Sequence, residues 1–148
     1  MKTFLSKLLL GKIVYKVSTD ASFEKVFEAL QQAIKNNNFA IPTIHNLKET
    51  YLKSNLPLNS DFEYRIVQLC NAQKSHKAIT TLSYDMGIMM PKSIVIAREN
   101  GKTTLRFMKM KPWMVALMFP KIKIAKMSAK VMGTLQKIVE ETVESAEK

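Results

Sequence analysis

The chain has 148 residues, enough for one domain with a sizeable core but hardly for two. Hydrophobic residues make up 47% and charged residues 24%, and four glycines and five prolines exclude collagen-like and linker-rich chains. The single cysteine, Cys70, excludes an internal disulfide framework, while 23 Lys and Arg against 12 Asp and Glu give a net charge of +11.

Residues 1–12 begin with the positive charge of a signal peptide, but Lys7 and Lys12 interrupt their apolar run and no A-x-A cleavage pattern follows. We therefore expect this segment to stay uncleaved. The longest apolar stretch, residues 113–119, is far shorter than the roughly 20 residues that span a bilayer. Together these features predict a cytoplasmic protein, at most peripheral to the inner face of the membrane.

The first half of the chain predicts two strands around a helix. Residues 13–17 alternate apolar with polar side chains, as in a half-buried strand. Residues 22–37 carry apolar side chains at helical spacing behind Ser22, an N-cap candidate, which predicts an amphipathic helix. Residues 39–44 predict a second strand, in which Pro42 favours a sheet edge or a bulge.

The second half predicts a hairpin followed by a long helix. The hairpin turn is Asn100-Gly101, because both residues accept the positive φ values of a tight turn. The other expected elements are a helix over about 47–53, a turn over 55–61, a strand over 62–70, a helix capped by Asn71 that ends near Leu82, extended segments over 88–90 and 93–97, a strand over 103–110, and a helix from about 122 to 146.

This order of strand, helix, four strands with short helical insertions and helix predicts an α+β fold. Two layers are expected, a largely antiparallel sheet with helices packed on one face. The sequence shows no internal repeat and no low-complexity segment. We expect a single domain over residues 1–148.

Four features follow one another in the middle of the chain. They are the helix opening at residues 22–26, the segment Tyr-Arg-Ile-Val-Gln-Leu-Cys-Asn at 64–71, a following helix that carries Ala78, and an apolar run that ends at Pro91 before a hairpin strand. In these features the chain resembles the prokaryotic family called domain of unknown function 302 (DUF302). The resemblance covers a core over residues 22–110 and leaves residues 111–148 as a basic C-terminal extension with a long helix. It implies a fold similar to the TATA-box-binding-protein topology and implies no settled activity.

The family pattern has Cys-Asn-Pro and Pro-Cys where this chain has Cys70-Asn71-Ala72 and Pro91-Lys92. If the two family cysteines cooperate in redox or metal chemistry, half of the pair is absent here. A thiol at a strand-to-helix junction, with Lys92 in place of the second cysteine and His76 six residues downstream, would still suit a reactive nucleophile. The alternative for Cys70 is a small buried hydrophobe, and His76 would then lie on a solvated helix face.

Nine of the ten methionines lie after residue 85, and Met110, Met114 and Met118 follow at i, i+4, i+8, so on a helix they would line one face. Thioethers suit Cu(I), and one could serve as an axial haem ligand. Methionine also fills irregular cores and adaptable apolar surfaces. The sequence assigns no metal site and names no cofactor.

The charge distribution is the clearest functional signal. Between Glu99 and Glu140 there is no acidic residue but there are nine basic ones. Lysines crowd the N-terminal half of the last helix, against its macrodipole, at a cost of about 0.3–1 kcal/mol per end charge, so helix stability does not explain them. The candidate surface comprises Lys109, Lys111, Trp113, Met114, Met118, Lys121, Lys123, Lys126 and Lys130. The alternative is a solvated basic face that aids solubility.

Apolar side chains between lysines suit in-plane docking on an anionic membrane or binding of a hydrophobic anionic ligand. The sequence lacks a Gly-rich phosphate loop, paired catalytic carboxylates and serine-triad spacing, so we expect a non-enzymatic binding domain that self-associates as a homodimer. A thiol-dependent redox, metal-handling or haem-handling protein centred on Cys70 is the alternative. Nucleic acid is a third possible partner, because the pI is 9.8, although no aromatic and basic RNA-binding signature is present.

Overall fold

The structure is a computed structural model that describes residues 13–148, so the predicted uncleaved segment at residues 1–12 lies outside it. The elements in chain order are β1 (Val14–Thr19), α2 (Phe23–Asn36), β2 (Ala40–Asn46), α3 (Leu47–Lys53), β3 (Tyr64–Cys70), α4 (Ala72–Lys77), the π-helical turn η1 (Ala78–Leu82), the 3₁₀ helix η2 (Tyr84–Met89), β4 (Lys92–Glu99), β5 (Lys102–Met108), α5 (Pro112–Met118) and α6 (Ala125–Ala146).

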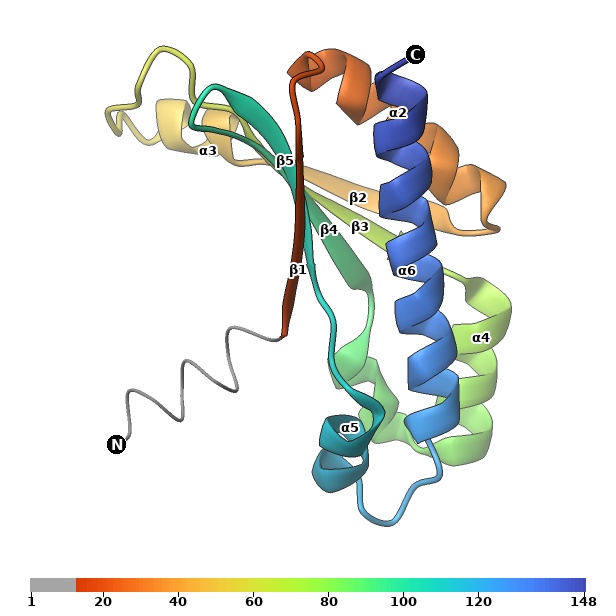
Figure 1. The fold of residues 1–148 in the computed structure, drawn as a ribbon. Helices are drawn as coiled ribbons and strands as arrows, with labels where there is room; N and C mark the ends of the chain where they lie inside the picture. The colour runs from red at the N-terminus through yellow and green to blue at the C-terminus, as the bar shows by residue number, and fades with distance from the viewer. Residues whose placement is uncertain (1–12) are drawn as a thin grey trace, which may run out of the picture.

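The five strands form one sheet in the order β1-β5-β4-β3-β2, and every neighbouring pair is antiparallel. Helices α2 and α6 pack against each other on one face of this sheet (Figure 1). The short α3 lies toward the other side, beside the turn that leads into β3 (Figure 1). The predicted α+β fold with an antiparallel sheet and helices on one face is confirmed.

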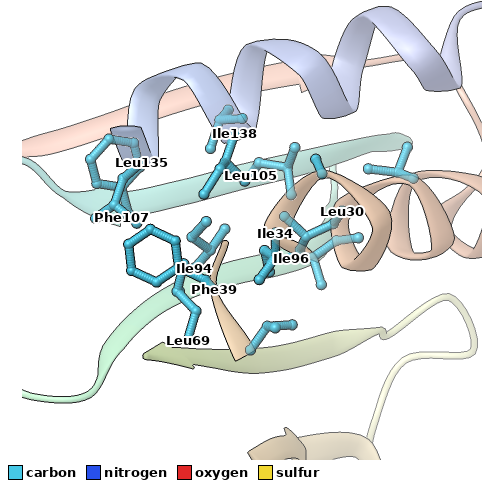
Figure 2. Close-up of a cluster of buried hydrophobic side chains, with 14 of the residues drawn as sticks. Leu30, Ile34, Phe39, Leu69, Ile94, Ile96, Leu105, Phe107, Leu135 and Ile138 are labelled. Atoms are coloured by element: carbon cyan, nitrogen blue, oxygen red, sulfur yellow. The ribbon is translucent and has the colours of Figure 1, made fainter. Parts of the chain in front are cut away.

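The core fills the space between the sheet and the two long helices. On α2, Val26, Leu30 and Ile34 recur at helical spacing and are fully buried, and Ile138 of α6 reaches the same cluster. The strands contribute alternate residues, such as Ile94 and Ile96 of β4, because successive side chains point to opposite faces. Figure 2 shows Leu30, Ile34, Ile94, Ile96 and Ile138 meeting between the layers. Full burial of each such side chain contributes about 1.5–3 kcal/mol to folding.

The predictions for the hairpin turn and for Pro42 are both confirmed. Asn100 and Gly101 have φ values of 53° and 76°, which are the positive values of the predicted tight hairpin turn. Strand β2 lies at the edge of the sheet, and its register with β3 shifts between Ala40 and Thr43. Pro42 therefore occupies both the edge and the irregularity that its missing N–H predicts.

Two local predictions are wrong. Residues 88–90 were expected to be extended, but η2 runs to Met89, and its first turn is fixed because the Ser83 hydroxyl accepts a hydrogen bond of 3.1 Å from the Asp85 N–H. Met110, Met114 and Met118 do not share one helix face. Helix α5 begins at Pro112, which holds the preceding residue extended, so Met110 lies outside the helix and is buried while Met118 is exposed.

Strands β4 and β5 part before their ends. Their pairing runs from the hairpin turn only as far as the pair Val95 and Arg106. Beyond it, β4 continues to Lys92 in register with β3, whereas β5 continues to Met108 in register with β1. Figure 1 shows the two strands diverging below the middle of the sheet. We call this opening the β4–β5 fork.

Candidate functional site

Helix α5 lies beyond the end of the sheet, where it builds a second small core. Its inward side chain Val115 and Phe119, the residue directly after the helix, pack with Met86 of η2, Ala78 of η1 and Ile124 of the loop before α6. Figure 1 shows α5 at the lower end of the molecule, next to the segment that precedes β4. This shared core holds α5 and η2 together, so their outward residues lie at the same end of the protein.

The outward side chains of this end are large and apolar. Trp113 is 51% exposed, Leu117 is 71% exposed and Ile88 of η2 is 76% exposed. Met118 and Tyr84 are exposed as well, whereas Met114 is half-buried against the small core. Neighbouring exposed apolar side chains of this size are typical of an interaction surface. We call Tyr84, Ile88, Trp113, Leu117 and Met118 the apolar tip.

Lysines flank α5 in the chain, at its N-terminus, in the loop that follows it and near the start of α6. Five of the candidate lysines are exposed and form no ion pair with any residue from 13 to 148, namely Lys111, Lys121, Lys123, Lys126 and Lys130. Lys109 differs, since its ammonium donates a hydrogen bond to the Gln136 side chain and lies 5.5 Å from the centre of the Tyr15 ring. The one acidic residue of η2, Asp85, is exposed. The tip therefore carries a clear positive excess.

Cys70 lies where β3 ends, one residue before the cap of α4. The Asn71 side chain accepts a hydrogen bond of 2.9 Å from the Lys74 N–H, which confirms the predicted cap. The Cys70 thiol is half-buried, and its Sγ lies 3.6 Å from the hydroxyl oxygen of Ser75. The ends of strand and helix thus hold the thiol in one place beside a hydroxyl.

The sheet brings Lys92 next to this junction. Lys92 pairs with Leu69 across β3 and β4, and it lines a small cavity of about 60 Å³ together with Cys70 and Asn71. Burial lowers the pKa of the Lys92 ammonium below its usual value, because an apolar environment disfavours the charged form. Lys92 has no ion-pair partner among residues 13–148. It is therefore a partly buried cation without an ion-pair partner in this part of the chain, and it lines the same cavity as Cys70.

The structure does not bring His76 to the thiol. His76 is exposed on α4, and its backbone carbonyl accepts a hydrogen bond from the Thr80 hydroxyl. The cavity that Cys70 lines does not include it. Within residues 13–148, no three His, Cys, Asp or Glu side chains converge as a metal site would require.

Sequence reasoning missed Lys74 and Ser75, which line the same cavity. The Lys74 ammonium lies 5.7 Å from the centre of the Phe39 ring, so the lining of this cavity contains a second cation besides Lys92. A signal for both existed, because a helix capped by Asn71 places the following residues on its first turn, directly after Cys70.

None of the helices in residues 13–148 is both long enough and apolar enough to traverse a bilayer.

Comparisons with known proteins place the fold. The family model described as "Domain of unknown function DUF302" matches residues 15–142. A solved structure, "uncharacterized conserved protein DUF302 from Bacillus stearothermophilus", is similar with a TM-score of 0.69 and 18% sequence identity. The similarity covers 90% of this chain and 98% of that one. No curated protein matches the chain. These matches agree on fold and family and carry no activity.

Proposed function

The chain belongs to the DUF302 family, whose description assigns no activity, and from its own surface we propose that it docks on an anionic membrane through the apolar tip and the flanking lysines. The docking is peripheral, with α5 and η2 lying in the plane of the lipid headgroups. The observation that carries the proposal is the exposure of Trp113, Leu117 and Ile88 at one end of the protein, together with flanking lysines that form no ion pair with any residue from 13 onward.

The two components act on different distance scales. Each lysine close to an anionic bilayer contributes about 1 kcal/mol, and this attraction weakens within a Debye length as salt is added. The apolar side chains act only on contact, when they leave water for the boundary between headgroups and acyl chains. Trp113 is well placed for that boundary, because an indole ring combines a large apolar body with one N–H donor.

Trp113 also reports on the docking directly, because it is the only tryptophan of the chain. We expect its fluorescence to shift to shorter wavelength when the protein meets vesicles of phosphatidylcholine and phosphatidylglycerol. Pure phosphatidylcholine vesicles should produce a much smaller shift. Added salt should reverse the binding, since the lysine contribution is screened. An unchanged spectrum with anionic vesicles at low salt would exclude this function.

Variants distinguish docking through the apolar tip from non-specific adsorption by exposed apolar residues elsewhere. Leu117→Ser and Ile88→Ser should reduce co-sedimentation with anionic vesicles and leave the fold intact, because both side chains project into solvent. Leu52→Ser is the matched control, since Leu52 is 55% exposed on α3, outside both hydrophobic clusters. Equal losses in all three variants would contradict docking through the tip. Retardation of DNA or RNA under conditions where vesicles are ignored would identify nucleic acid as the partner instead.

A second candidate function is thiol chemistry at Cys70, favoured by the cavity that Cys70 shares with Lys92. A nearby ammonium stabilises a thiolate, so we expect iodoacetamide to alkylate Cys70 faster than free cysteine at neutral pH. Lys92→Met should slow that reaction, and Lys102→Met, an exposed lysine of the hairpin, should not. Alkylation slower than that of free cysteine would reject this candidate.

A further inference from the structure

The β4–β5 fork contains a cavity of about 420 Å³. This volume falls within the range of about 300–1,000 Å³ that is usual for small-molecule sites. The cavity reaches from the face of the sheet that α2 and α6 leave open to side chains of the core. Its apolar walls include Val14, Met89, Val95, Phe107, Met108 and Leu135.

The charged residues of the lining are both cations. Lys92 lies at one strand of the fork and Arg106 at the other, and the lining includes no aspartate or glutamate. Lys92 is half-buried and makes no ion pair with residues 13–148. Arg106 does bond to Glu99, but Glu99 also accepts from Lys16, so these three groups still sum to one positive charge. The cavity and the groups around it thus carry a net positive charge that no acidic side chain of residues 13–148 neutralises.

Arg106 also has an unused donor. One of its terminal nitrogens donates to Glu99 and to the Thr104 hydroxyl, 2.9 Å away, whereas its Nε is buried and finds no partner in residues 13–148. A buried N–H without an acceptor costs about 1–3 kcal/mol, so such groups in native proteins point to a missing partner.

We propose that the β4–β5 fork binds a single-chain amphiphile with an anionic head, of the class of long-chain carboxylates. The apolar chain lies among the side chains of the fork, and Lys92 and Arg106 supply the positive charge for the head. A small hydrophilic anion would leave the apolar walls uncovered, and a neutral or cationic amphiphile would leave the charges of the site uncompensated. This inference does not rest on membrane docking, because the fork and the apolar tip share only Ile88, which borders both, and otherwise present different side chains.

The methionine methyl groups locate the ligand. Met89 and Met108 line the fork, whereas Met118 belongs to the apolar tip. Titration of methyl-labelled methionine protein with decanoate, without vesicles and below its micelle concentration, should shift the Met89 and Met108 signals and leave Met118 unchanged. Calorimetry should show decanoate binding at least about tenfold tighter than decanol or acetate, as expected for a charge-assisted contact together with a buried chain. Shifts at Met118 alone would overturn the fork and support the tip.

Variants test the walls and the charges separately. Ser93→Phe fills the cavity from β4, and Met108→Trp, at an exposed rim position, fills it with less risk to folding. Either should abolish decanoate binding, whereas Ile44→Phe on edge strand β2 should not. Lys92→Met and Arg106→Gln together should weaken decanoate about tenfold or more and leave decanol unchanged. Full decanoate affinity in the filled variants, or in the charge variant, would overturn the proposal.

Discussion

The Asn71 side chain joins two elements that are far apart in the sequence: its Nδ2 donates a hydrogen bond of 2.9 Å to the backbone carbonyl of Asn38, while its Oδ1 caps α4. Asn38 itself has a φ of 63°, in the turn that leads from α2 to β2. One amide group therefore fixes both the start of α4 and the loop beside it, next to Cys70.

Asn71→Ala should lower the free energy of unfolding by about 1–2 kcal/mol, because it removes an N-cap and a second hydrogen bond. Asn71→Asp retains the acceptor for the cap and loses only the donor to Asn38, so its loss should be smaller. Urea unfolding followed by circular dichroism measures both. Asn46→Ala is the matched control, since Asn46 caps only α3, through a longer bond of 3.3 Å. Equal stability of Asn71→Ala and the wild type would refute the dual role.

Two glycines should respond to alanine in opposite directions. Gly101 has a φ of 76° in the hairpin turn, and an added Cβ would meet nothing within 4 Å, so Gly101→Ala suffers only from backbone strain of about 1–2 kcal/mol. Gly133 lies in α6 with the same open space and without a positive φ, so Gly133→Ala should stabilise by about 0.5–1 kcal/mol. The melting temperatures of the two variants and the wild type measure both effects. A higher melting temperature for Gly101→Ala would contradict a positive φ at this position.

Lys92 should make stability depend on pH in the alkaline range. Its pKa is lower in the folded protein than in the unfolded chain, because burial disfavours the ammonium. Between those two pKa values the unfolded chain binds more protons, so the free energy of unfolding rises with pH. Lys92→Met removes the buried charge, and should therefore be more stable than the wild type at neutral pH, with a difference that shrinks toward the ordinary lysine pKa of about 10.4.

The control for Lys92 is Lys102→Met, whose exposed ammonium lies 3.7 Å from Asp20. Exposed pairs of this kind contribute little to stability, so the control should follow the wild type. The other titratable side chains of the cavities around Lys92 are Lys74, Cys70 and Arg106. A constant difference between Lys92→Met and the wild type at all pH values would contradict a lowered pKa.

Glu99 should make the stability of the fold depend on pH in the acidic range. Hydrogen bonds from Arg106 and Lys16 lower the pKa of its carboxyl in the folded protein. The stabilising contribution is complete above the unfolded pKa and is lost as the pH falls through the folded pKa. Glu99→Gln should thus lower the melting temperature at neutral pH and match the wild type in strongly acidic buffer. Glu144→Gln, which loses an exposed pair with Lys148, should show almost no effect at either pH.

The sequence predicts what depends on neighbouring residues. The helix at residues 22–37, the Asn100-Gly101 turn and the Asn71 cap each follow from a local pattern, and each is present. The extended segment at residues 88–90 is wrong, because a serine cap at Ser83 outweighs the apolar pattern there. A single proline likewise separates Met110 from the helix that carries Met114 and Met118.

The sites depend on pairing between distant residues, which no local pattern contains. Lys92 was connected with Cys70 through a family pattern, and only the pairing of β3 with β4 gives the cavity that they share. The β4–β5 fork arises because each strand follows a different outer neighbour, a choice made by the whole sheet. The exposure of Trp113 and Leu117 likewise cannot be predicted without knowing which side of α5 packs against the small core.

The uneven charge of α6 has a consequence before any contact is made. The helix is about 33 Å long for its 22 residues, with lysines toward α5 and glutamates toward the C-terminus. The backbone macrodipole has the same sense, positive at the lysine end and negative at the glutamate end. Backbone and side chains thus add up to one permanent electric moment along the molecule. Near a negatively charged surface the electric field exerts a torque on this moment and turns the α5 end toward the surface. A larger fraction of encounters then begins with α5 facing the surface, which raises the association rate.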